Sequence, residues 1–358
     1  MPMLEKRDLE TTRAALRDWL RATLPESAEP ELVEVTLPEG SGFSSETLLV
    51  TANWRDEQGL RTHELVVRLA STRFKVVREV SLTNQLRVMR LLAEHSAVPV
   101  PEVLWYEPDE TIIGGPFLVM RKVPGRVPSD QPPYHEAGWL VDTPPAERTA
   151  IWWSGLDTVV RLHSLDVRSH DLSFLAGAGQ DPVAALLDRL GEQQAWVTEA
   201  DLPEIRDARA WLLANQPAVH DDPVLLWGDA RLGNMLFTGT SVTGALDWEK
   251  AMVGPREIDL AWFLYVDRHH SEAVRLPRLP GLPDATETVA RYQELTGHEL
   301  RDLPYFEVLS GYHFALLMIK ALALLIEFGL LPEDVGAAYV RDNSSTQLLR
   351  GALADVAR

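Results

Sequence analysis

The sequence predicts an α+β protein with two lobes, in which an antiparallel sheet is followed by a mainly helical region. Three observations support this fold class. Segments rich in β-branched residues alternate with glycine-containing turns before residue 122, helical periodicity dominates afterwards, and 358 residues suit two domains or two lobes. The composition changes near residue 122, so we expect one lobe over residues 1–122 and a second over residues 123–358.

The first lobe is predicted to be an antiparallel five-strand sheet that carries one helix. An amphipathic helix opens the chain, indicated by the spacing of Leu16, Trp19 and Leu20. Glycine and aspartate residues punctuate the β-rich segments that follow, which is typical of an antiparallel meander. The strands are expected at 33–37, 47–51, 64–69, 103–106 and 117–120, and the helix at 76–93.

The second lobe is predicted to be mostly α-helical. Residues 123–145 are rich in proline and should form an irregular segment long enough for a lid or a binding loop. Short strands are expected only between Val224 and Trp248, and His269 and His270 are expected to form a solvated helix end. Helices are predicted near 147–164, 181–197, 203–216, 256–267, 284–296 and 304–328.

The composition excludes several classes of protein. The net charge is −19, divided as −4 over residues 1–122 and −15 over the rest, so the chain lacks the basic surface needed for nucleic acid. The absence of cysteine excludes disulfides and thiolate chemistry. Lys320 interrupts the most apolar stretch, Phe314–Ile326, which suggests a buried helix rather than a membrane span. A charged N-terminus without an apolar run leads us to expect a cytoplasmic location.

The functional prediction depends on polar residues within residues 224–249. Apolar strand candidates bracket Asp229, Asn234 and Asp247, and residues 239–241 should form a hairpin turn between the last two strands. Such a hairpin would bring Asn234 and Asp247 to the same end of adjacent strands. Their oxygens could then bind Mg²⁺ while phosphates and water complete its coordination. Asp229 would face the same place.

These residues resemble the aminoglycoside phosphotransferase family, part of the protein-kinase-like superfamily. The segment Asp229-Ala230-Arg231-Leu232-Gly233-Asn234, followed by Asp247, is similar to the kinase pattern Asp-x-Lys-x-x-Asn with its later metal-binding aspartate. The resemblance implies that Asp229 orients or deprotonates a substrate hydroxyl and that Arg231 contacts the γ-phosphate. It also implies that Asn234 and Asp247 hold Mg²⁺. The most similar branch includes the kinase-like domain of some acyl-CoA dehydrogenases.

Three further positions follow from this resemblance. Residues 254–262 also match the family, and Asp259 within them is expected to brace the catalytic loop. Trp227 stands where the family usually has a histidine, so we expect the loop to be supported differently. His163 is expected to be buried and bonded to the catalytic loop rather than to act in catalysis.

The first lobe is predicted to clamp the nucleotide. Small residues around Gly42, Phe43 and Ser44 would let backbone N–H groups approach the phosphates. By resemblance, Arg68 replaces the strand lysine that contacts the α- and β-phosphates, and Glu79 is its partner at the start of the next helix. The alternative for Arg68 and Glu79 is a surface ion pair of small energetic value.

Residues 120–125 resemble the hinge that reads adenine. The resemblance implies that the Arg121 carbonyl and the Val123 amide bind the base, while Met120 forms a wall of its pocket. As plain structure the same residues would be a linker between domains, and both interpretations are compatible.

The leading hypothesis is a phosphotransferase that uses ATP and Mg²⁺ to phosphorylate a hydroxyl of a small molecule, with GTP as the alternative donor. Only eleven residues separate Asp247 from Asp259, which leaves no room for an activation segment that docks a peptide. The acidic second lobe would suit a cationic acceptor. The alternatives are a hydroxyacyl or other small-alcohol kinase and a nucleotide-binding pseudokinase without turnover. No residue decides the acceptor or predicts an oligomeric state.

Overall fold

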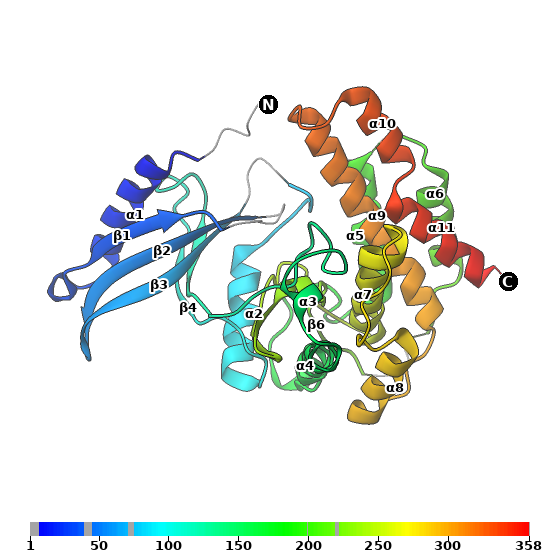
Figure 1. Ribbon diagram of the computed structural model, residues 1–358, viewed down its shortest axis with the longest axis horizontal. Helices are drawn as coiled ribbons and strands as arrows, with labels where there is room; N and C mark the ends of the chain where they lie inside the picture. Colours follow the sequence, from blue (N-terminus) through cyan, green and yellow to red (C-terminus); the bar gives the residue numbers. More distant parts are fainter. Residues whose placement is uncertain (1–6, 39–44, 71–74, 199, 219–221, 358) are drawn as a thin grey trace. The chain divides into compact units, whose positions relative to one another are not determined.

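The chain divides into two compact units in a computed structural model (Figure 1). The first unit comprises Met1–Arg90 and Pro101–Val123, and the second comprises Leu91–Val100 and Pro124–Arg358. The predicted roles of the two lobes, nucleotide clamping and acceptor binding, stay predictions. The structure describes residues 7–38, 45–70, 75–198, 200–218 and 222–357.

The first unit contains the predicted antiparallel sheet of five strands, in the order β1-β2-β3-β5-β4. Side chains alternate between the two faces of each strand, and Leu65, Val67 and Leu69 of β3 are therefore buried on one face. The strands are β1 (Glu31–Thr36), β2 (Ser45–Asp56), β3 (Gly59–Ala70), β4 (Val103–Glu107) and β5 (Phe117–Arg121).

Two helices cover this sheet. Leu16 and Leu20 of α1 (Leu9–Thr23) pack in the same cluster as Phe117 and Val119 of β5. Leu82 and Leu86 of α2 (Leu82–His95) pack instead on Leu118. Because neighbouring residues of a strand point to opposite faces, α1 and α2 lie on opposite faces of β5.

The start of α2 differs from the prediction. Leucine periodicity suggested a helix from residue 76, whereas α2 begins at Leu82. The Ser81 hydroxyl accepts a hydrogen bond from the Asn84 backbone N–H at 3.1 Å, which is the bond expected of an N-cap residue. The helix therefore starts where this cap satisfies its first donors, and Glu79 precedes it.

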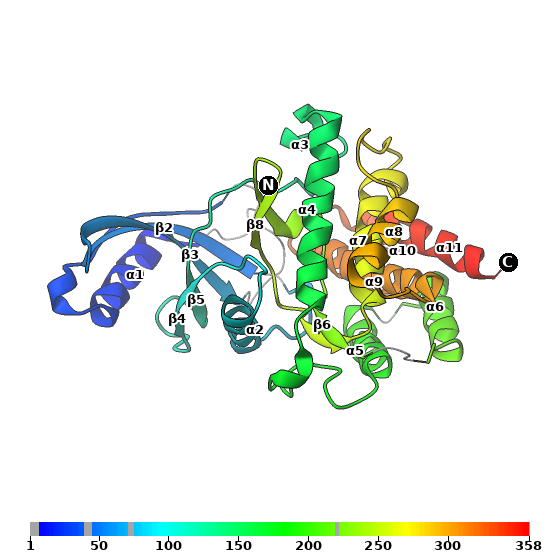
Figure 2. The ribbon, with the colours of Figure 1, turned by 90° about the horizontal axis from the view of Figure 1, so that it is seen from below.

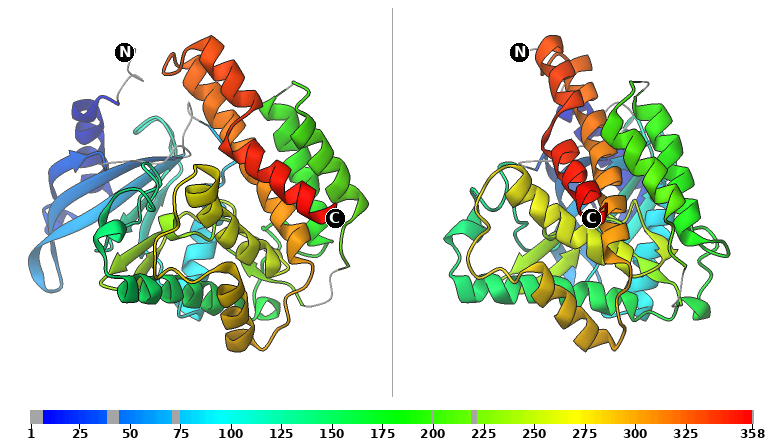
Figure 3. Two further views of the ribbon diagram at one scale, coloured as in Figure 1. Left: turned by 45° about the vertical axis from the view of Figure 1, so that its right-hand side comes forward. Right: turned by 90° about the vertical axis from the view of Figure 1, so that its right-hand side faces the viewer.

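The second unit is built mainly of helices around α9. Leu309, Leu316 and Ile319 of α9 belong to a large apolar cluster shared with α5, α6, α7 and α11. Both views of Figure 3 show α11, in red, lying along α9, in orange. The helices are α3 (Trp139–Asp142), α4 (Pro145–His163), α5 (Pro182–Val197), α6 (Pro203–Ala214), α7 (Glu257–Arg268), α8 (Ala285–Thr296), α9 (Leu303–Glu327), α10 (Glu333–Arg341) and α11 (Ser344–Val356).

Helix α9 is unusually apolar. Of the helices in the described residues, it alone is long and apolar enough to cross a membrane. Half of its most apolar window is buried inside the protein, and the core helix of a folded domain has the same property. The expected buried helix is therefore present, and it extends well beyond Phe314–Ile326 at its N-terminal end.

Four short strands in the second unit surround Asp229, Asn234 and Asp247, the candidate site residues. β6 (Val224–Leu226) pairs with β9 (Met252–Gly254), while β7 (Met235–Thr238) and β8 (Ser241–Ala245) form a hairpin. β9 was not predicted. Figure 2 shows β8 beside α4, where the Val242 backbone N–H donates to the Ser154 hydroxyl at 2.9 Å. The hairpin is thus fixed to a long helix.

Candidate active site

Asp229 lies in the loop after β6, and donors from separate parts of the chain hold its carboxylate. The Trp262 indole N–H donates to Oδ1 at 2.8 Å, and Nε of Arg231 lies 3.3 Å from the same oxygen. The Lys250 ammonium donates to Oδ2 at 3.2 Å and lies 4.9 Å from the centre of the Trp262 ring. Only 8 % of the Asp229 side chain is exposed. These contacts fix the orientation of the carboxylate.

The charges around Asp229 determine its protonation. Burial would raise the pKa of Asp229, but the Lys250 ammonium, the Arg231 guanidinium and the Trp262 hydrogen bond outweigh burial and lower the pKa to about 2. Asp229 is therefore ionised throughout the physiological pH range. Such a carboxylate can accept a hydrogen bond from a substrate hydroxyl.

Arg231 lies between two carboxylates. Its Nη1 donates to Oδ2 of Asp130 at 2.5 Å, while its Nε faces Asp229. Burial opposes the charge of Arg231, but the Asp130 and Asp229 carboxylates outweigh burial and raise its pKa above the ordinary value. A permanently charged guanidinium thus stands beside the ionised Asp229.

The catalytic loop is braced by Asp259 of α7, as predicted. The fully buried carboxylate of Asp259 accepts hydrogen bonds from the backbone N–H groups of Trp227 at 2.7 Å and Gly228 at 2.8 Å. His163 is buried, as predicted, but its Nε2 lies 3.1 Å from Oδ2 of Asp259 on α7 instead of bonding the loop directly. Gly228 has φ +76°, and a Cβ there would overlap the Lys250 carbonyl oxygen, so this position requires glycine.

Trp227 supports the loop as a hydrogen-bond donor and through ring stacking. Its indole N–H donates to the Leu246 carbonyl at 2.8 Å and lies 3.2 Å from the Asp247 carbonyl. The ring also stacks on Trp248 at 4.9 Å between centroids. This tryptophan therefore ties the loop that carries Asp229 to the backbone of Asp247.

The β7–β8 hairpin brings Asn234 and Asp247 together at one end. Met235 pairs with Ala245, and the Leu246 backbone N–H donates to the Asn234 carbonyl at 2.9 Å. The Asn234 side-chain nitrogen donates to the Asp229 carbonyl at 3.0 Å. Asp247 itself adopts φ +63°, a left-handed conformation that is unusual for a residue with a side chain. The predicted hairpin geometry is confirmed, while metal binding stays a prediction.

The remaining predicted site residues belong to the first unit. Arg68 is on β3 opposite Leu118, and Met120 and Arg121 end β5, where Met120 is buried. Val123 follows as the last residue of the unit. Their roles toward a nucleotide stay predictions. Residues 42–44, the predicted phosphate loop, lie outside the described residues.

Glu79 is placed differently from the expectation that it opens a helix. It precedes α2, its side chain is 83 % exposed, and its carboxylate lies 3.5 Å from the guanidinium of Arg78. Its proposed pairing with Arg68 stays a prediction.

Three residues of the site were missed by sequence reasoning. Trp262 lies within residues 254–262, which resemble the family, but it had no predicted role. Lys250 lies three residues after Asp247. Asp130 lies in the proline-rich stretch, about a hundred positions before its partner Arg231, and no spacing could have found it. His270, expected to be solvated, is 7 % exposed and lies 3.7 Å from Asp130.

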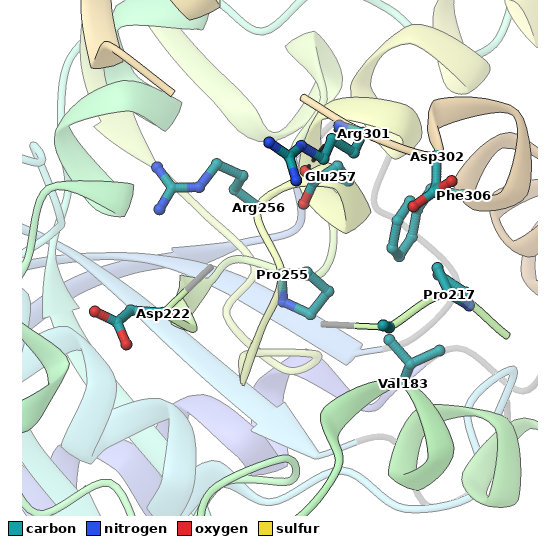
Figure 4. Close-up of a pocket in the computed structure, with 10 residues that line it drawn as sticks. Val183, Pro217, Asp222, Pro255, Arg256, Glu257, Arg301, Asp302 and Phe306 are labelled. Atoms are coloured by element: carbon teal, nitrogen blue, oxygen red, sulfur yellow. Dashed lines mark hydrogen bonds between the residues drawn. The ribbon is translucent and has the colours of Figure 1, made fainter. Parts of the chain in front are cut away.

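A separate small pocket lies in the second unit (Figure 4). Val183, Pro255, Arg256, Glu257 and Phe306 are among the residues that line it. Its cavity of about 20 Å³ is large enough for a single water molecule. The residues that line it do not include any predicted site residue of the described chain, so the Asp229 loop remains the candidate site.

The sheet of the first unit, the catalytic loop and the hairpin of the second define a kinase-like phosphotransferase. The chain belongs to the phosphotransferase enzyme family, whose model matches residues 37–304. The chain is similar to acyl-CoA dehydrogenase family member 11 of Gallus gallus, with 34 % identity over 166 residues, and of Homo sapiens, with 32 % identity over 167 residues. Each match covers 46 % of this chain and 20 % of the relative, so the matched region is about a fifth of the relatives' length.

Solved structures share the fold. A Ralstonia eutropha protein assigned as an aminoglycoside phosphotransferase has a TM-score of 0.68 and 22 % identity, with 95 % of this chain and 98 % of that chain covered. An aminoglycoside 2'-phosphotransferase in complex with GDP has a TM-score of 0.59 and 14 % identity, with 96 % and 99 % covered. A phosphotransferase in complex with AMP-PNP and hygromycin B has a TM-score of 0.55 and 16 % identity, with 94 % and 98 % covered.

Proposed function

We propose that the chain transfers the γ-phosphoryl group of ATP to a hydroxyl of a small molecule. The observation that carries this proposal is the ionised carboxylate of Asp229, buried within 3.3 Å of the Arg231 guanidinium beside the end of the β7–β8 hairpin. Family membership supports it, and complexes of similar folds with AMP-PNP and with GDP support a nucleotide as the donor.

The donor atoms at the hairpin end fit Mg²⁺. The Asn234 side-chain nitrogen is committed to the Asp229 carbonyl, so its amide oxygen is the atom left for a ligand. This oxygen and the Asp247 carboxylate would provide two protein ligands, a number that Mg²⁺ commonly takes beside phosphates and water. A bound Mg²⁺ would neutralise charge on the phosphate oxygens.

In the proposed reaction, Asp229 accepts a hydrogen bond from the acceptor hydroxyl and directs its oxygen toward the γ-phosphorus. The new oxygen–phosphorus bond forms as the bond to the leaving ADP oxygen breaks, and the hydroxyl proton passes through Asp229 to solvent. Because its pKa is about 2, Asp229 is a weak base and contributes mainly by orientation. Arg231 stabilises the charge of the transferred group.

Charge distinguishes the candidate acceptors. The net −15 of residues 123–358 would attract a cationic acceptor such as an aminoglycoside. Lys250 opposes this, because its ammonium lies 3.2 Å from the carboxylate that must receive the hydroxyl. A hydroxyacyl compound or another small alcohol is therefore the second candidate, and the similarity to acyl-CoA dehydrogenase family members also favours it.

A panel of acceptors tests the function. The protein is incubated with ATP, Mg²⁺ and separate aminoglycosides, hydroxyacyl compounds and simple alcohols, and each acceptor is examined by mass spectrometry for one added phosphoryl group. We expect at least one product, and Asp229→Asn should lower its formation roughly a hundredfold or more while nucleotide affinity is kept. Nucleotide binding without product from any acceptor would identify a pseudokinase instead.

A further inference from the structure

Asp130 lies on a segment that backbone contacts fix to the catalytic hairpin. Before Asp130, Arg126 and Phe237 exchange two backbone hydrogen bonds of 2.9 Å. After it, the Trp139 indole N–H donates to the Val127 carbonyl at 2.9 Å, and the Arg126 guanidinium lies 4.4 Å from the Trp139 ring centre. The position of Asp130 relative to the hairpin is therefore set on both sides.

The Asp130 carboxylate limits the freedom of Arg231. Oδ2 of Asp130 accepts from Nη1 of Arg231 at 2.5 Å, and Oδ1 of Asp229 lies 3.3 Å from Nε of the same guanidinium. A planar guanidinium that donates a hydrogen bond to one carboxylate and faces a second one is restricted in its orientation. Its third nitrogen, Nη2, is the one that neither carboxylate engages.

Gly233 allows the two side chains to meet. A Cβ on Gly233 would overlap both Nη1 of Arg231 and Oδ1 of Asp130. The pair therefore packs directly against the backbone of the catalytic loop. Both overlapping atoms are ends of side chains, so an added methyl group could be accommodated by displacing the ion pair and leaving the backbone in place.

We propose that Asp130 is a positioning residue for phosphoryl transfer, which aims the Arg231 guanidinium at the transferred group. This inference rests on the proposed function. Asp130 acts through Arg231 and has no chemical step of its own. Its contribution is to fix the orientation of Nη2 of Arg231 beside Asp229. Asp229 then positions the hydroxyl, and Arg231 positions the phosphoryl group.

The substitution Asp130→Asn removes the charge and keeps the size of the side chain. We expect kcat to fall roughly tenfold to a hundredfold because Arg231 is no longer aligned. The KM for ATP should change little, because loss of a negative charge beside Arg231 favours the binding of an anion and offsets the loss of alignment. A merely structural role would lower the melting temperature and raise KM for both substrates. That pattern, or an unchanged kcat, would overturn the proposal.

A double-mutant cycle tests whether Asp130 acts through Arg231. Turnover is compared for Asp130→Asn, Arg231→Met and the double variant at saturating ATP. If Asp130 only aims Arg231, adding Asp130→Asn to Arg231→Met should change kcat by less than about twofold. Losses that multiply would contradict the proposal. The control is Asp201→Asn, which breaks an exposed pair with Arg206 in the same unit and should leave kcat unchanged.

Gly233→Ala should displace the ion pair of Asp130 and Arg231, because the added Cβ overlaps atoms of both side chains. It keeps both charges and should reproduce the kcat loss of Asp130→Asn, with little further loss when the two are combined. If Gly233→Ala leaves kcat intact, the alignment of the pair does not matter to turnover and the proposal is wrong.

Exchange of the guanidinium protons gives a readout without turnover. In the nucleotide-free protein, the N–H protons of the Arg231 guanidinium should exchange slowly with solvent, as measured by NMR. In Asp130→Asn their exchange should be fast. Fast exchange in the wild type would overturn the inference itself. If exchange behaves as stated while no acceptor is phosphorylated, the proposed function fails and the fixed position of Arg231 is retained.

Discussion

At the scale of residues, the donors around Asp229 decide where a hydroxyl can approach. A carboxylate has about four acceptor sites, and Oδ1 accepts a hydrogen bond from Trp262 and lies 3.3 Å from Nε of Arg231. Oδ2 accepts a hydrogen bond from Lys250, its one donor among the residues that the structure describes. An acceptor hydroxyl on Oδ2 would therefore lie next to an ammonium group, which would repel an amine of the acceptor placed nearby.

Lys250→Met is expected to change the pH profile of turnover. The pKa of Asp229 is about 2 because the Lys250 and Arg231 charges outweigh burial. Without Lys250 burial has more weight, so the pKa rises, and Asp229 is protonated over more of the acidic range. The acidic limb of kcat/KM should then move upward by at least about one pH unit. The measurement is kcat/KM from pH 2 to pH 8, a range that reaches the wild-type pKa of Asp229.

Lys250→Arg serves as the control for that experiment. It retains a positive charge beside Asp229 and should keep the acidic limb near its wild-type position, although a guanidinium has a different shape. Identical pH profiles for Lys250→Met and the wild type would show that Lys250 does not control the charge of Asp229.

Sequence reasoning found the candidate site residues that lie within one short segment. Asp229, Asn234 and Asp247 follow one another across three strands, so spacing alone placed them together. Lys250 and Asp130 carry charge, but nothing in the pattern showed which carboxylate or guanidinium each would meet. Their partners depend on how distant segments pack, and this information is absent from local spacing.

At the scale of elements, the β7–β8 hairpin unites the predicted metal ligands. Asp247→Ala should weaken ATP binding in the presence of Mg²⁺ by at least roughly tenfold. Loss of a residue that only supports a metal ligand already lowers metal affinity by about this factor, and Asp247 is predicted to be a ligand itself. Binding without Mg²⁺ should change little, because the lost oxygen contacts the metal rather than the nucleotide. Calorimetric titrations with and without Mg²⁺ provide the comparison. Equal effects in both titrations would remove Asp247 from the metal site.

Helix α7 continues into a π-helical turn that the periodicity did not reveal. Its predicted range was nearly correct, yet residues His269–Ala273 turn inward and both histidines are buried. Nε2 of His269 lies 3.1 Å from the Ser344 hydroxyl, at the start of α11. The α11 contact comes from residues more than seventy positions away, so the helix end could not be identified as buried from its own sequence.

These buried histidines predict a loss of stability in acid. Burial lowers the pKa of His270 to about 4 and that of His269 to about 3. Between these values and the ordinary pKa near 6.5, the unfolded chain binds protons that the folded chain does not. The free energy of unfolding therefore falls as pH falls through this range, by roughly 3 kcal/mol from His270 at pH 4.

His270→Gln should reduce this pH dependence. The difference in unfolding free energy between pH 7 and pH 4, measured by denaturant titration, should shrink relative to the wild type because a buried histidine that takes up a proton on unfolding is removed. His298→Gln at an exposed position controls for the loss of a histidine elsewhere. An undiminished difference in His270→Gln would show that His270 is not buried in its neutral form.

Regular elements were predictable where they carry their own pattern. Helix α4 differs by one or two residues from its predicted range because proline at its start and apolar spacing are both local signals. Strand β9 has three residues and is specified by pairing with β6, so no internal periodicity could reveal it. Helices α10 and α11 were likewise not predicted.

At the scale of the whole molecule, the division into units does not follow the chain in order. Residues Leu91–Val100 belong to the second unit although β4 and β5 follow them in the first. The Pro99 carbonyl accepts a hydrogen bond from the Ala245 backbone N–H at 2.6 Å, which ties this segment to the catalytic hairpin. Composition could suggest a boundary near residue 122, but it could not reveal that residues 91–100 belong to the second unit.

The uneven charge of the chain predicts how salt affects the acceptor. Residues 123–358 carry −15 and residues 1–122 carry −4, so a cationic acceptor should be drawn to the protein over distances that salt screens beyond about 8 Å. For such an acceptor, kcat/KM should fall as salt rises, while nucleotide affinity, which depends on close contacts, should change less.

The salt dependence of kcat/KM for a neutral or anionic acceptor, measured in the same buffer series, is the control. For such an acceptor, kcat/KM should stay level or rise with salt, because no long-range attraction is lost and any repulsion is screened. Lys250 adds a short-range effect that salt screens less, since its ammonium is only 10 % exposed beside Asp229. If every cationic acceptor shows a salt-independent kcat/KM, the charge of the second unit does not recruit the substrate, and the hydroxyacyl or other small-alcohol candidates become the stronger ones.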